Sequence, residues 1–217
     1  MQKPRLLVFA SGSPTGGGSG FRELVKNSRT GVLAADIIGV ISNHTHGGVA
    51  ELARQWDIPF RSMPKPYDAE SYRALVAEFK AAFVSLSGWL KIVAGLDPAT
   101  TINIHPGPLP LFGGKGLYGH HVHEAVMAAY HQRTLTASAV TMHFVTPEYD
   151  RGPIFFQYPV YIQPDDTADT LAAQVNKIEH GWQSYITNLV ITGQIRLEND
   201  RVIAPAWYPF VPKKQAT

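Results

Sequence analysis

The first half of the sequence alternates short, apolar, β-rich runs with longer segments of helical periodicity, and this alternation restricts the possible folds most strongly. A helix after each strand is typical of parallel strands joined by crossover connections. Three such pairs follow one another, with strands at 5–10, 36–42 and 58–61 and helices at 21–30, 49–56 and 68–81. The pattern predicts an α/β fold, a doubly wound, mostly parallel sheet with helices on both faces.

The rest of the chain predicts further strands and two more helices. In the last helix, apolar residues recur at spacings of three and four from Leu171 to Leu189, after a cap at Asp166-Thr167. The other expected elements are strands at 83–87, 101–105, 139–145 and 154–161, a helix at 122–130 and a hairpin at 195–203. The two strands after residue 130 suit the later part of the sheet.

Composition limits the class of protein. The 217 residues suit one domain spanning 1–217, long enough to bury roughly 70% of the surface that the unfolded chain exposes. A net charge of +2 gives no broad attraction to nucleic acid, and the lack of cysteine excludes disulfides, thiolate zinc sites and a thiol nucleophile. No segment approaches the roughly 20 apolar residues that cross a bilayer. We expect a cytoplasmic protein without nucleic-acid or membrane partners, either a monomer or a homodimer.

Three polar side chains follow the ends of two predicted strands. Asn103 and His105 end one strand, and Asp150 follows another. An amide, an imidazole and a carboxylate suit acid/base chemistry on a carbonyl, although a lone histidine is usually structural and an aspartate there is a common turn former. Asn103 and His105 share one face of their strand and can donate to one oxyanion. We predict that the three converge at the carboxyl edge of the sheet and that Asp150 favours the imidazolium form of His105.

A glycine-rich loop at 11–20 separates the first strand from the first helix. Glycines let backbone N–H groups surround an anion, and the start of a helix adds unpaired N–H groups and a positive dipole end. The loop has no Gly-Lys-Ser/Thr ending, so it is not a P-loop. It is either a flexible connection or a phosphate site, which its position favours, with Gly18, Ser19 and Gly20 as the expected phosphate-binding residues.

Several of these motifs together resemble a known family. They are Asn-x-His-Pro at 103–106, a glycine-rich run at 113–119, and His-Phe-Val-Thr at 143–146 leading into Asp-x-Gly-Pro at 150–153. They resemble the formyltransferase-fold enzymes that use 10-formyltetrahydrofolate, and among these the phosphoribosylglycinamide formyltransferases of purine biosynthesis. The resemblance runs from about residue 6 to residue 190. It implies a Rossmann-like fold, a catalytic role for Asn103, His105 and Asp150, and transfer of a formyl group to a small-molecule amine.

The resemblance also implies the binding residues. The folate co-substrate would contact Leu90, Lys91, Ile92, Val145 and Thr146. Glu179, by default a solvated helix residue, would hold the substrate amine. In the family the glycine loop is shorter and usually ends Gly-Ser-Asn or Gly-Thr-Asn, whereas this chain has Gly-Ser-Gly at 18–20.

A histidine cluster, His120, His121 and His123, raises the question of a metal. No cysteine, His-Glu-x-x-His motif or acidic clamp accompanies it, so we expect no metal. One of the three is expected to line the crevice, and the other two to be exposed on the following helix.

Other functions are compatible with the same motifs. A formyltetrahydrofolate hydrolase uses the triad with water as nucleophile, and a methionyl-tRNA formyltransferase shares the core, but each usually carries an added domain that we do not expect here. A sugar-amine formyltransferase is harder to exclude. A non-catalytic nucleotide-binding module, in which the triad is only structural, belongs to a different class.

Overall fold

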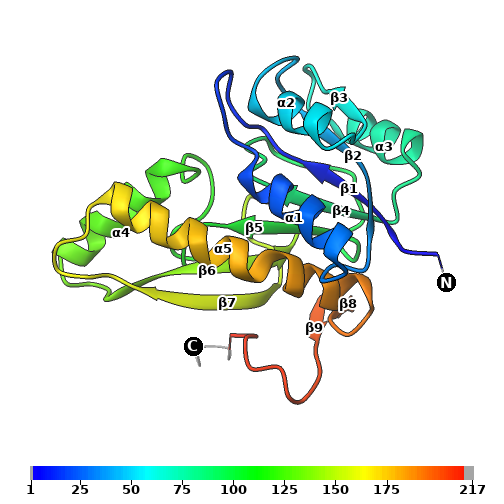
Figure 1. Cartoon of the computed structure of the whole chain (residues 1–217). Helices are drawn as coiled ribbons and strands as arrows, with labels where there is room; N and C mark the ends of the chain where they lie inside the picture. Colours follow the sequence, from blue (N-terminus) through cyan, green and yellow to red (C-terminus); the bar gives the residue numbers. More distant parts are fainter. Residues whose placement is uncertain (1, 213–217) are drawn as a thin grey trace.

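The computed structural model describes residues 2–212 and is built on a seven-stranded sheet with the order β3-β2-β1-β4-β5-β6-β7 (Figure 1). Its strands are β1 Arg5–Phe9, β2 Asp36–Ser42, β3 Phe60–Ser62, β4 Phe83–Ser87, β5 Thr101–His105, β6 Ala137–Phe144 and β7 Ile154–Tyr161. The helices are α1 Ser19–Thr30, α2 Gly48–Gln55, α3 Ala69–Glu78, α4 His120–His131 and α5 Ala168–Ile191, and β8 Arg196–Glu198 pairs with β9 Arg201–Ile203 in a hairpin. The predicted fold is confirmed, and every predicted strand and helix has a counterpart at nearly the same residues.

Two predicted strands are displaced by two residues at their start: β6 begins at Ala137 and not at 139, and β3 begins at Phe60 and not at Ile58. The Ile58 N–H still donates to the Ala53 carbonyl, which closes the last turn of α2. Pairing with β2 therefore starts only at Pro59, whose carbonyl accepts the Val40 N–H at 2.9 Å.

The sheet has a parallel part and an antiparallel part. Strands β3, β2, β1, β4 and β5 run parallel, whereas β6 is antiparallel to both β5 and β7. The strand order reverses between β1 and β4, and ligands of open α/β sheets bind at the carboxyl ends of the strands beside such a reversal. The fold therefore places a crevice where the loops after β1, β4 and β5 begin.

Two apolar cores cover the two faces of the parallel part. One contains residues of β1, β2, α1 and α2, among them Val8, Phe21 and Val40, and the other contains Phe9, Tyr72 and residues of β4. Burying these faces contributes most of the favourable free energy of folding in this part. The ends of the strands are held in fixed positions as a result.

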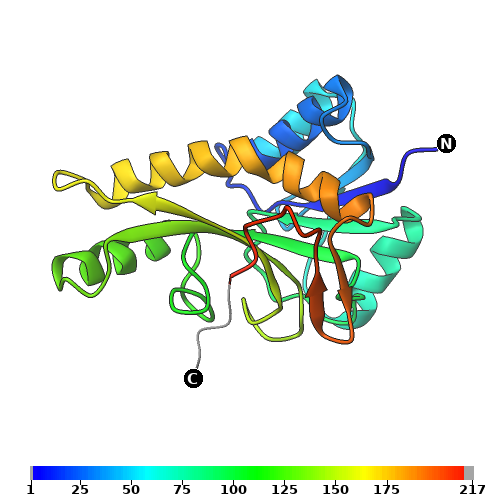
Figure 2. The same ribbon diagram turned by 90° about the horizontal axis from the view of Figure 1, so that it is seen from below.

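The antiparallel part extends away from the parallel strands together with α4 and α5 (Figures 1 and 2). Its core joins β5, β6 and β7 to both helices and to the segment after β9. The Gln157 N–H of β7 donates to the Phe210 carbonyl, and the Tyr208 hydroxyl donates to the Phe155 carbonyl. The segment after β9 thus covers part of the otherwise unpaired edge of the sheet.

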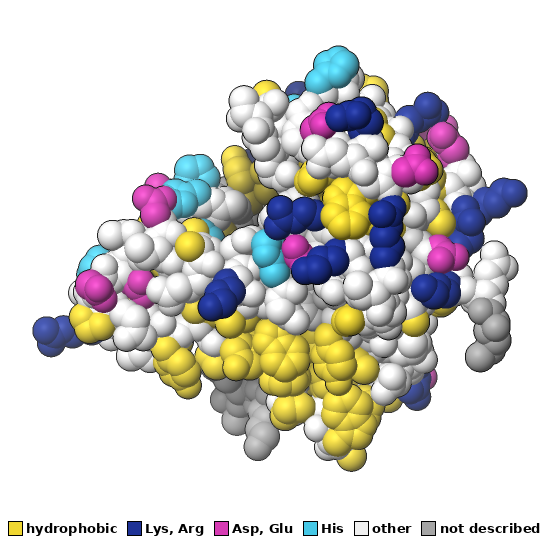
Figure 3. Space-filling view, viewed as in Figure 1, with side chains coloured by type: hydrophobic (Ala, Val, Ile, Leu, Met, Phe, Trp, Pro, Cys, Tyr) yellow, Lys and Arg dark blue, Asp and Glu magenta, His cyan; other side chains and the backbone are white. Residues whose placement is uncertain are grey.

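The surface carries charges of both signs, with Lys and Arg side chains gathered over α1 and α5 and an apolar band below α5 (Figure 3). Within residues 2–212, no helix has the length and apolar character needed to span a bilayer.

Candidate active site

A cavity of about 720 Å³ lies at the carboxyl ends of β1, β4 and β5. The start of α1, the turn at 114–119, the start of α4 and one face of α5 complete its lining. Asn103, His105 and Asp150 all border it, as do Gly18–Gly20, Leu90 and Glu179. The fold therefore gathers into one cavity residues up to 171 positions apart in the sequence, from Gly12 to Gln183.

The three predicted catalytic side chains meet. The Asn103 amide Nδ2 donates to Asp150 Oδ1 at 3.4 Å, and His105 Nδ1 lies 3.7 Å from Asp150 Oδ2. The predicted convergence is confirmed, but the end of strand β6 does not itself lie beside the end of β5, as we expected. Because β6 is antiparallel to β5, it ends at the opposite edge, and the loop 145–150 carries Asp150 back. Asp150 is held there with φ of 52° while its Oδ2 accepts the Gly114 N–H at 3.0 Å.

The tautomer of His105 follows from its hydrogen bond to the backbone. Its Nε2 lies 2.7 Å from the Phe112 carbonyl oxygen, which can only accept, so Nε2 carries a proton. The atom that gains or loses a proton is therefore Nδ1, which faces Asp150. The ring presents its basic nitrogen to the carboxylate.

The protonation state of His105 depends on two opposing effects. Burial lowers the pKa of His105 below its ordinary value, because the ring is only 4% exposed. The nearby Asp150 carboxylate favours the imidazolium, as expected, but its effect is smaller than that of burial. At neutral pH the resting imidazole is neutral and able to accept a proton at Nδ1.

A fourth side chain, His143, belongs to the same cluster and was not predicted as a site residue. It lies opposite Asn103 in the antiparallel pairing of β5 and β6 and is 2% exposed. Its Nδ1 donates to the Phe144 carbonyl at 2.9 Å, which leaves Nε2 to accept the Asn103 amide at 3.1 Å. A histidine in the strand before Asp150 was visible in the sequence, but only the antiparallel register of β5 and β6 shows that it pairs with Asn103.

The carboxyl of Asp150 is kept ionised by its surroundings. Burial acts to raise the pKa of Asp150, but the two imidazoles, whenever one of them carries a proton toward the carboxylate, and the hydrogen bond from the Gly114 N–H outweigh it, and the pKa is lower than usual. Both N–H bonds of the Asn103 amide already face acceptors, His143 Nε2 and Asp150 Oδ1. An oxyanion in the cavity would therefore replace Asp150 as one of these acceptors.

The start of α1 offers unused backbone donors. Within the described residues, the N–H groups of Ser19, Gly20 and Phe21 have no acceptor, and the first bond of the helix runs from Arg22 N–H to the Gly18 carbonyl. No side chain caps this end. Three free N–H groups at the positive end of a helix dipole form an anion-binding surface. The predicted phosphate residues thus lie in the same cavity as the triad.

Glu179 lines the cavity from α5. Burial raises the pKa of its carboxyl to about 7, and Asn176 acts in the opposite direction. A carboxyl that titrates near neutral pH can ionise when an amine or hydroxyl donor comes within hydrogen-bonding distance. Its position in the cavity is compatible with the predicted role toward the substrate amine.

The predicted folate residues divide between two adjoining cavities. Leu90 borders the large one, whereas Lys91, Ile92, Val145 and Thr146 border a second cavity of about 40 Å³. The two cavities share Trp89, Asn103, Tyr149 and Asp150 in their linings. The small cavity has room for about three water molecules at ~10–15 Å³ each, too little for a two-ring pterin.

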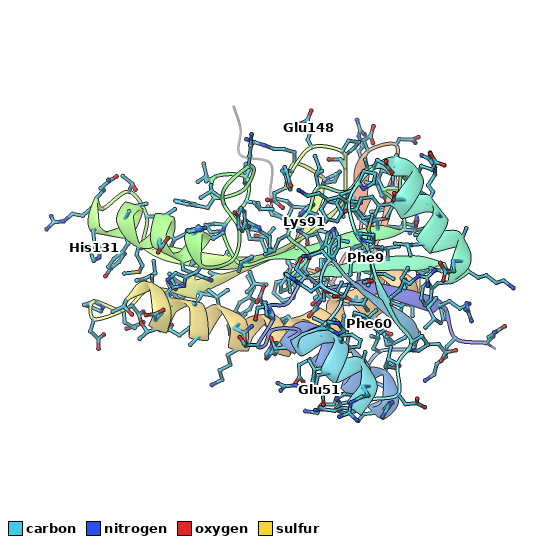
Figure 4. The ribbon with its side chains drawn as sticks, turned by 90° about the horizontal axis from the view of Figure 1, so that it is seen from above. Phe9, Glu51, Phe60, Lys91, His131 and Glu148 are labelled. Carbon is cyan, nitrogen blue, oxygen red and sulfur yellow. The ribbon has the colours of Figure 1, made fainter. Side chains whose placement is uncertain are left out.

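Hydrogen bonds anchor the segment at 88–92. Ser11 Oγ accepts the Leu90 N–H at 3.0 Å, while Trp89 Nε1 donates to the Tyr72 hydroxyl at 2.9 Å. That hydroxyl in turn donates to the Ile92 carbonyl at 2.7 Å. Figure 4 places Lys91 near the central strands and Glu148 farther out on the loop 145–150. The segment at 88–92 is therefore held in place by hydrogen bonds, and the loop 145–150 forms the outer wall of the small cavity beside it.

Two histidines of the α4 cluster, not one, line the cavity. They are His120 and His123, whereas His121 Nδ1 pairs with Glu124 Oε2 at 2.9 Å. His120 and His121 are exposed, as expected of two of the three, although His120 also borders the cavity. His123 is buried because the first turn of α4 packs onto the core, and burial lowers its pKa to about 4. Across residues 2–212, His, Asp and Glu side chains form no group of three or more that could hold a metal ion.

Comparison with known proteins identifies the family. A model of the family described as "Formyl transferase" matches residues 4–189. The chain belongs to this family. It is 34% identical to the chloroplastic phosphoribosylglycinamide formyltransferase of Arabidopsis thaliana, over 99% of this chain and 72% of that protein. It is 36% identical to the enzyme of that name from Vigna unguiculata, over 83% of this chain and 58% of the relative.

Solved structures agree with this assignment. Glycinamide ribonucleotide transformylase 1 of Symbiobacterium toebii superposes with a TM-score of 0.79 at 25% identity, covering 92% of this chain and 93% of that one. A formyltetrahydrofolate deformylase of Pseudomonas syringae has a TM-score of 0.76 at 22% identity, over 94% of this chain and 66% of its own, and shares the fold. The predicted family is confirmed, and the predicted activity is the one that the transformylase relatives carry in their names. The plant relatives are named chloroplastic, so the predicted cytoplasmic location stays a prediction.

Proposed function

We propose that the protein transfers the formyl group of 10-formyltetrahydrofolate to the amine of phosphoribosylglycinamide, a step of purine biosynthesis. The observation that carries the proposal is the single cavity that holds Asn103, His105 and Asp150 together with the free N–H groups of α1. Relatives named phosphoribosylglycinamide formyltransferase align with most of the chain. Residues 1–217 would act as one formyltransferase domain on small-molecule substrates.

The acceptor would bind by its two charged ends. Its phosphate accepts the N–H groups at the start of α1, where the helix dipole favours an anion. Its amine lies toward Glu179, whose carboxyl ionises readily at neutral pH. These two contacts direct the amine to the same cavity as the triad.

The donor would enter beside the segment at 88–92. Membership of the family implies a formyl donor, and the folate identity is part of the proposal. The pterin would lie between Leu90 and the loop 145–150, and the small cavity behind Lys91 would widen as that loop moves. The formyl carbon is then presented to Asn103.

The triad would act on the carbonyl during transfer. The neutral amine attacks the formyl carbon, and the Asn103 amide stabilises the oxyanion by exchanging its bond to Asp150 for one to the oxyanion. His105 Nδ1, unprotonated at rest, accepts the proton that the amine loses and returns it to the departing folate nitrogen. Asp150 stabilises the imidazolium that forms in between. The 3.7 Å separation of Nδ1 and Oδ2 leaves room for closer approach or for a bridging water.

An assay with each substrate alone and with both together tests the proposal. Purified protein should consume 10-formyltetrahydrofolate only when phosphoribosylglycinamide is present, and should form the N-formyl product in equal amount. Rapid release of formate without the amine would instead indicate a deformylase, and transfer to an amino sugar alone would indicate another acceptor. If the protein binds phosphoribosylglycinamide but turns over neither substrate, it would be a non-catalytic nucleotide-binding module.

A further inference from the structure

A buried amide lies against the start of α1 and has no role in the proposed chemistry. Gln183 of α5 is 1% exposed and borders the large cavity. Its Nε2 donates to Ser87 Oγ, at the end of β4, at 2.9 Å. Its Oε1 accepts no hydrogen bond from the residues that the structure describes. One side of a buried amide is therefore anchored, and the other side is unpaired beside the cavity.

Gly20 allows this pair to reach the helix. A Cβ added at Gly20 would lie 2.2 Å from Ser87 Oγ and 3.0 Å from Gln183 Oε1. Any larger residue at this position would collide with the pair. Two side chains from α5 and β4 thus occupy the place that a side chain of the first turn of α1 would take, next to the free N–H groups of Gly20 and Phe21.

The chemistry of the pair supplies a donor in either orientation of the amide. As drawn, Ser87 Oγ accepts from Gln183, so the hydroxyl proton of Ser87 is free to point into the cavity. If the amide turns over, Oε1 accepts the Ser87 proton and the Gln183 N–H₂ group faces the start of α1. In both cases one side-chain donor is directed toward an anion held by the backbone.

We propose that Gln183 and Ser87 form a phosphate-recognition pair, adding a neutral side-chain donor to the backbone N–H groups of α1. This inference rests on the proposed function, which places a phosphorylated acceptor at that helix end. A hydrogen bond to a charged group contributes more than a neutral one, so its loss should weaken phosphate binding about 10- to 100-fold. The pair would thereby help distinguish a phosphorylated acceptor from its phosphate-free counterpart.

The binding test uses ribose 5-phosphate and measures its Kd by calorimetry or NMR titration. Gln183→Met keeps the packing but removes the amide, which either donates to the anion or holds Ser87 Oγ in position, and Ser87→Ala removes the hydroxyl. Each should raise the Kd about 10-fold or more. Gln183→Glu can still accept from Ser87 but brings a negative charge to the anion, so it should raise the Kd the most. The matched control is Asn27→Ala, which breaks another α1–α5 bond, from Asn27 Nδ2 to Ser184 Oγ, with neither residue in the lining of the cavity.

A transfer assay separates recognition from structure. The ratio of kcat/KM for phosphoribosylglycinamide to that for the phosphate-free riboside should fall in Gln183→Met, whereas a merely structural role would lower both values together. If wild type binds ribose 5-phosphate and the folded Gln183 and Ser87 variants bind it equally well, the pair has no such role. The same conclusion holds if wild type does not bind it at all. If wild type transfers no formyl group but the variants still lose phosphate affinity, the proposed activity fails and the recognition pair stands.

Discussion

The two halves of the molecule contribute different kinds of chemical group to one cavity. The first half, β1–β4 with α1–α3, supplies backbone: the N–H groups at the start of α1 and the anchored segment 88–92. The second half, β5–β7 with α4 and α5, supplies titratable side chains, which are His105, His143, Asp150 and Glu179. Backbone donors keep the same charge at every pH, whereas the side chains change theirs.

This division separates fixed groups from titratable ones. The first half can hold an anion and a pterin ring without moving a proton, because it presents fixed dipoles and hydrogen bonds. The second half carries groups whose pKa values are displaced by burial and by each other. Changes in the first half should therefore alter substrate affinity without altering its pH dependence, whereas changes in the second half should alter turnover or affinity together with the pH dependence.

The largest effect is expected from His105→Ala. Turnover should fall on the order of 10²–10³, or about 3–4 kcal/mol, because the group that receives the proton is lost, while folate affinity stays nearly intact. Steady-state kinetics with both substrates and a folate-binding measurement check this. The matched control is His131→Ala at the far end of α4 (Figure 4), which should leave both values unchanged. Equal transfer rates for His105→Ala and wild type would remove His105 from the mechanism.

Glu179→Gln should act next most strongly, through the acceptor. The KM for phosphoribosylglycinamide should rise roughly 10- to 100-fold, because a hydrogen bond to an ionised carboxylate is lost. In wild type, acceptor affinity should increase as pH rises through about 7, where the Glu179 carboxyl ionises. That step should be missing from the variant and present in the control Glu198→Gln, an exposed residue of β8 outside the cavity lining.

The same carboxyl links stability to pH. The pKa of Glu179 is raised in the folded protein, so its contribution to stability is fully present below the unfolded pKa of ~4.3 and is lost as pH rises toward about 7. Thermal unfolding of wild type and Glu179→Gln across pH 4–8 should show a smaller decline in the variant over that window. Parallel curves would contradict the raised pKa.

Gly18→Val tests the backbone half. Gly18 has φ of 82°, and an added Cβ would meet Val49 at 3.0 Å, so the start of α1 should shift. We expect acceptor KM to rise about 10-fold with little change in turnover at saturation, because the N–H groups no longer converge. The control is Gly31→Val at the other end of the same helix, where φ is 87° and the surrounding space is open. It imposes a similar backbone strain far from the cavity. An unchanged Kd for phosphoribosylglycinamide in Gly18→Val would refute the phosphate assignment.

The smallest effect is expected from Tyr72→Phe, which loosens the segment 88–92. The change removes the acceptor of Trp89 Nε1 and the donor to the Ile92 carbonyl. Stability should fall by about 1–3 kcal/mol and donor KM should rise a few-fold, with acceptor KM unchanged. Denaturant unfolding and kinetics measure both. Tyr161→Phe, at an exposed position of β7, is the control that should alter neither.

The oligomeric state and the cellular location stay predictions. The exposed apolar residues Tyr161, Tyr185 and Trp207 lie on β7, α5 and the segment after β9. Size-exclusion chromatography with light scattering would distinguish a monomer from a homodimer.

The sequence by itself determined the strands, the helices and the identity of the three central polar residues. Apolar periodicity is a local property, and the motif around Asn103 and His105 needs only the alternation of a strand to place both side chains on one face. The order of chemical groups along the chain was therefore enough to predict the family and the fold.

Only the tertiary structure decided which groups touch and in what protonation state. The antiparallel register of β5 and β6 places His143 against Asn103, and the loop 145–150 returns Asp150 to His105. Burial then makes the resting His105 neutral, against the charge effect expected from Asp150. The meeting of Gln183, Ser87 and Gly20 likewise joins three separate elements. Register, burial and such contacts depend on residues distant in sequence, so no local pattern contains them.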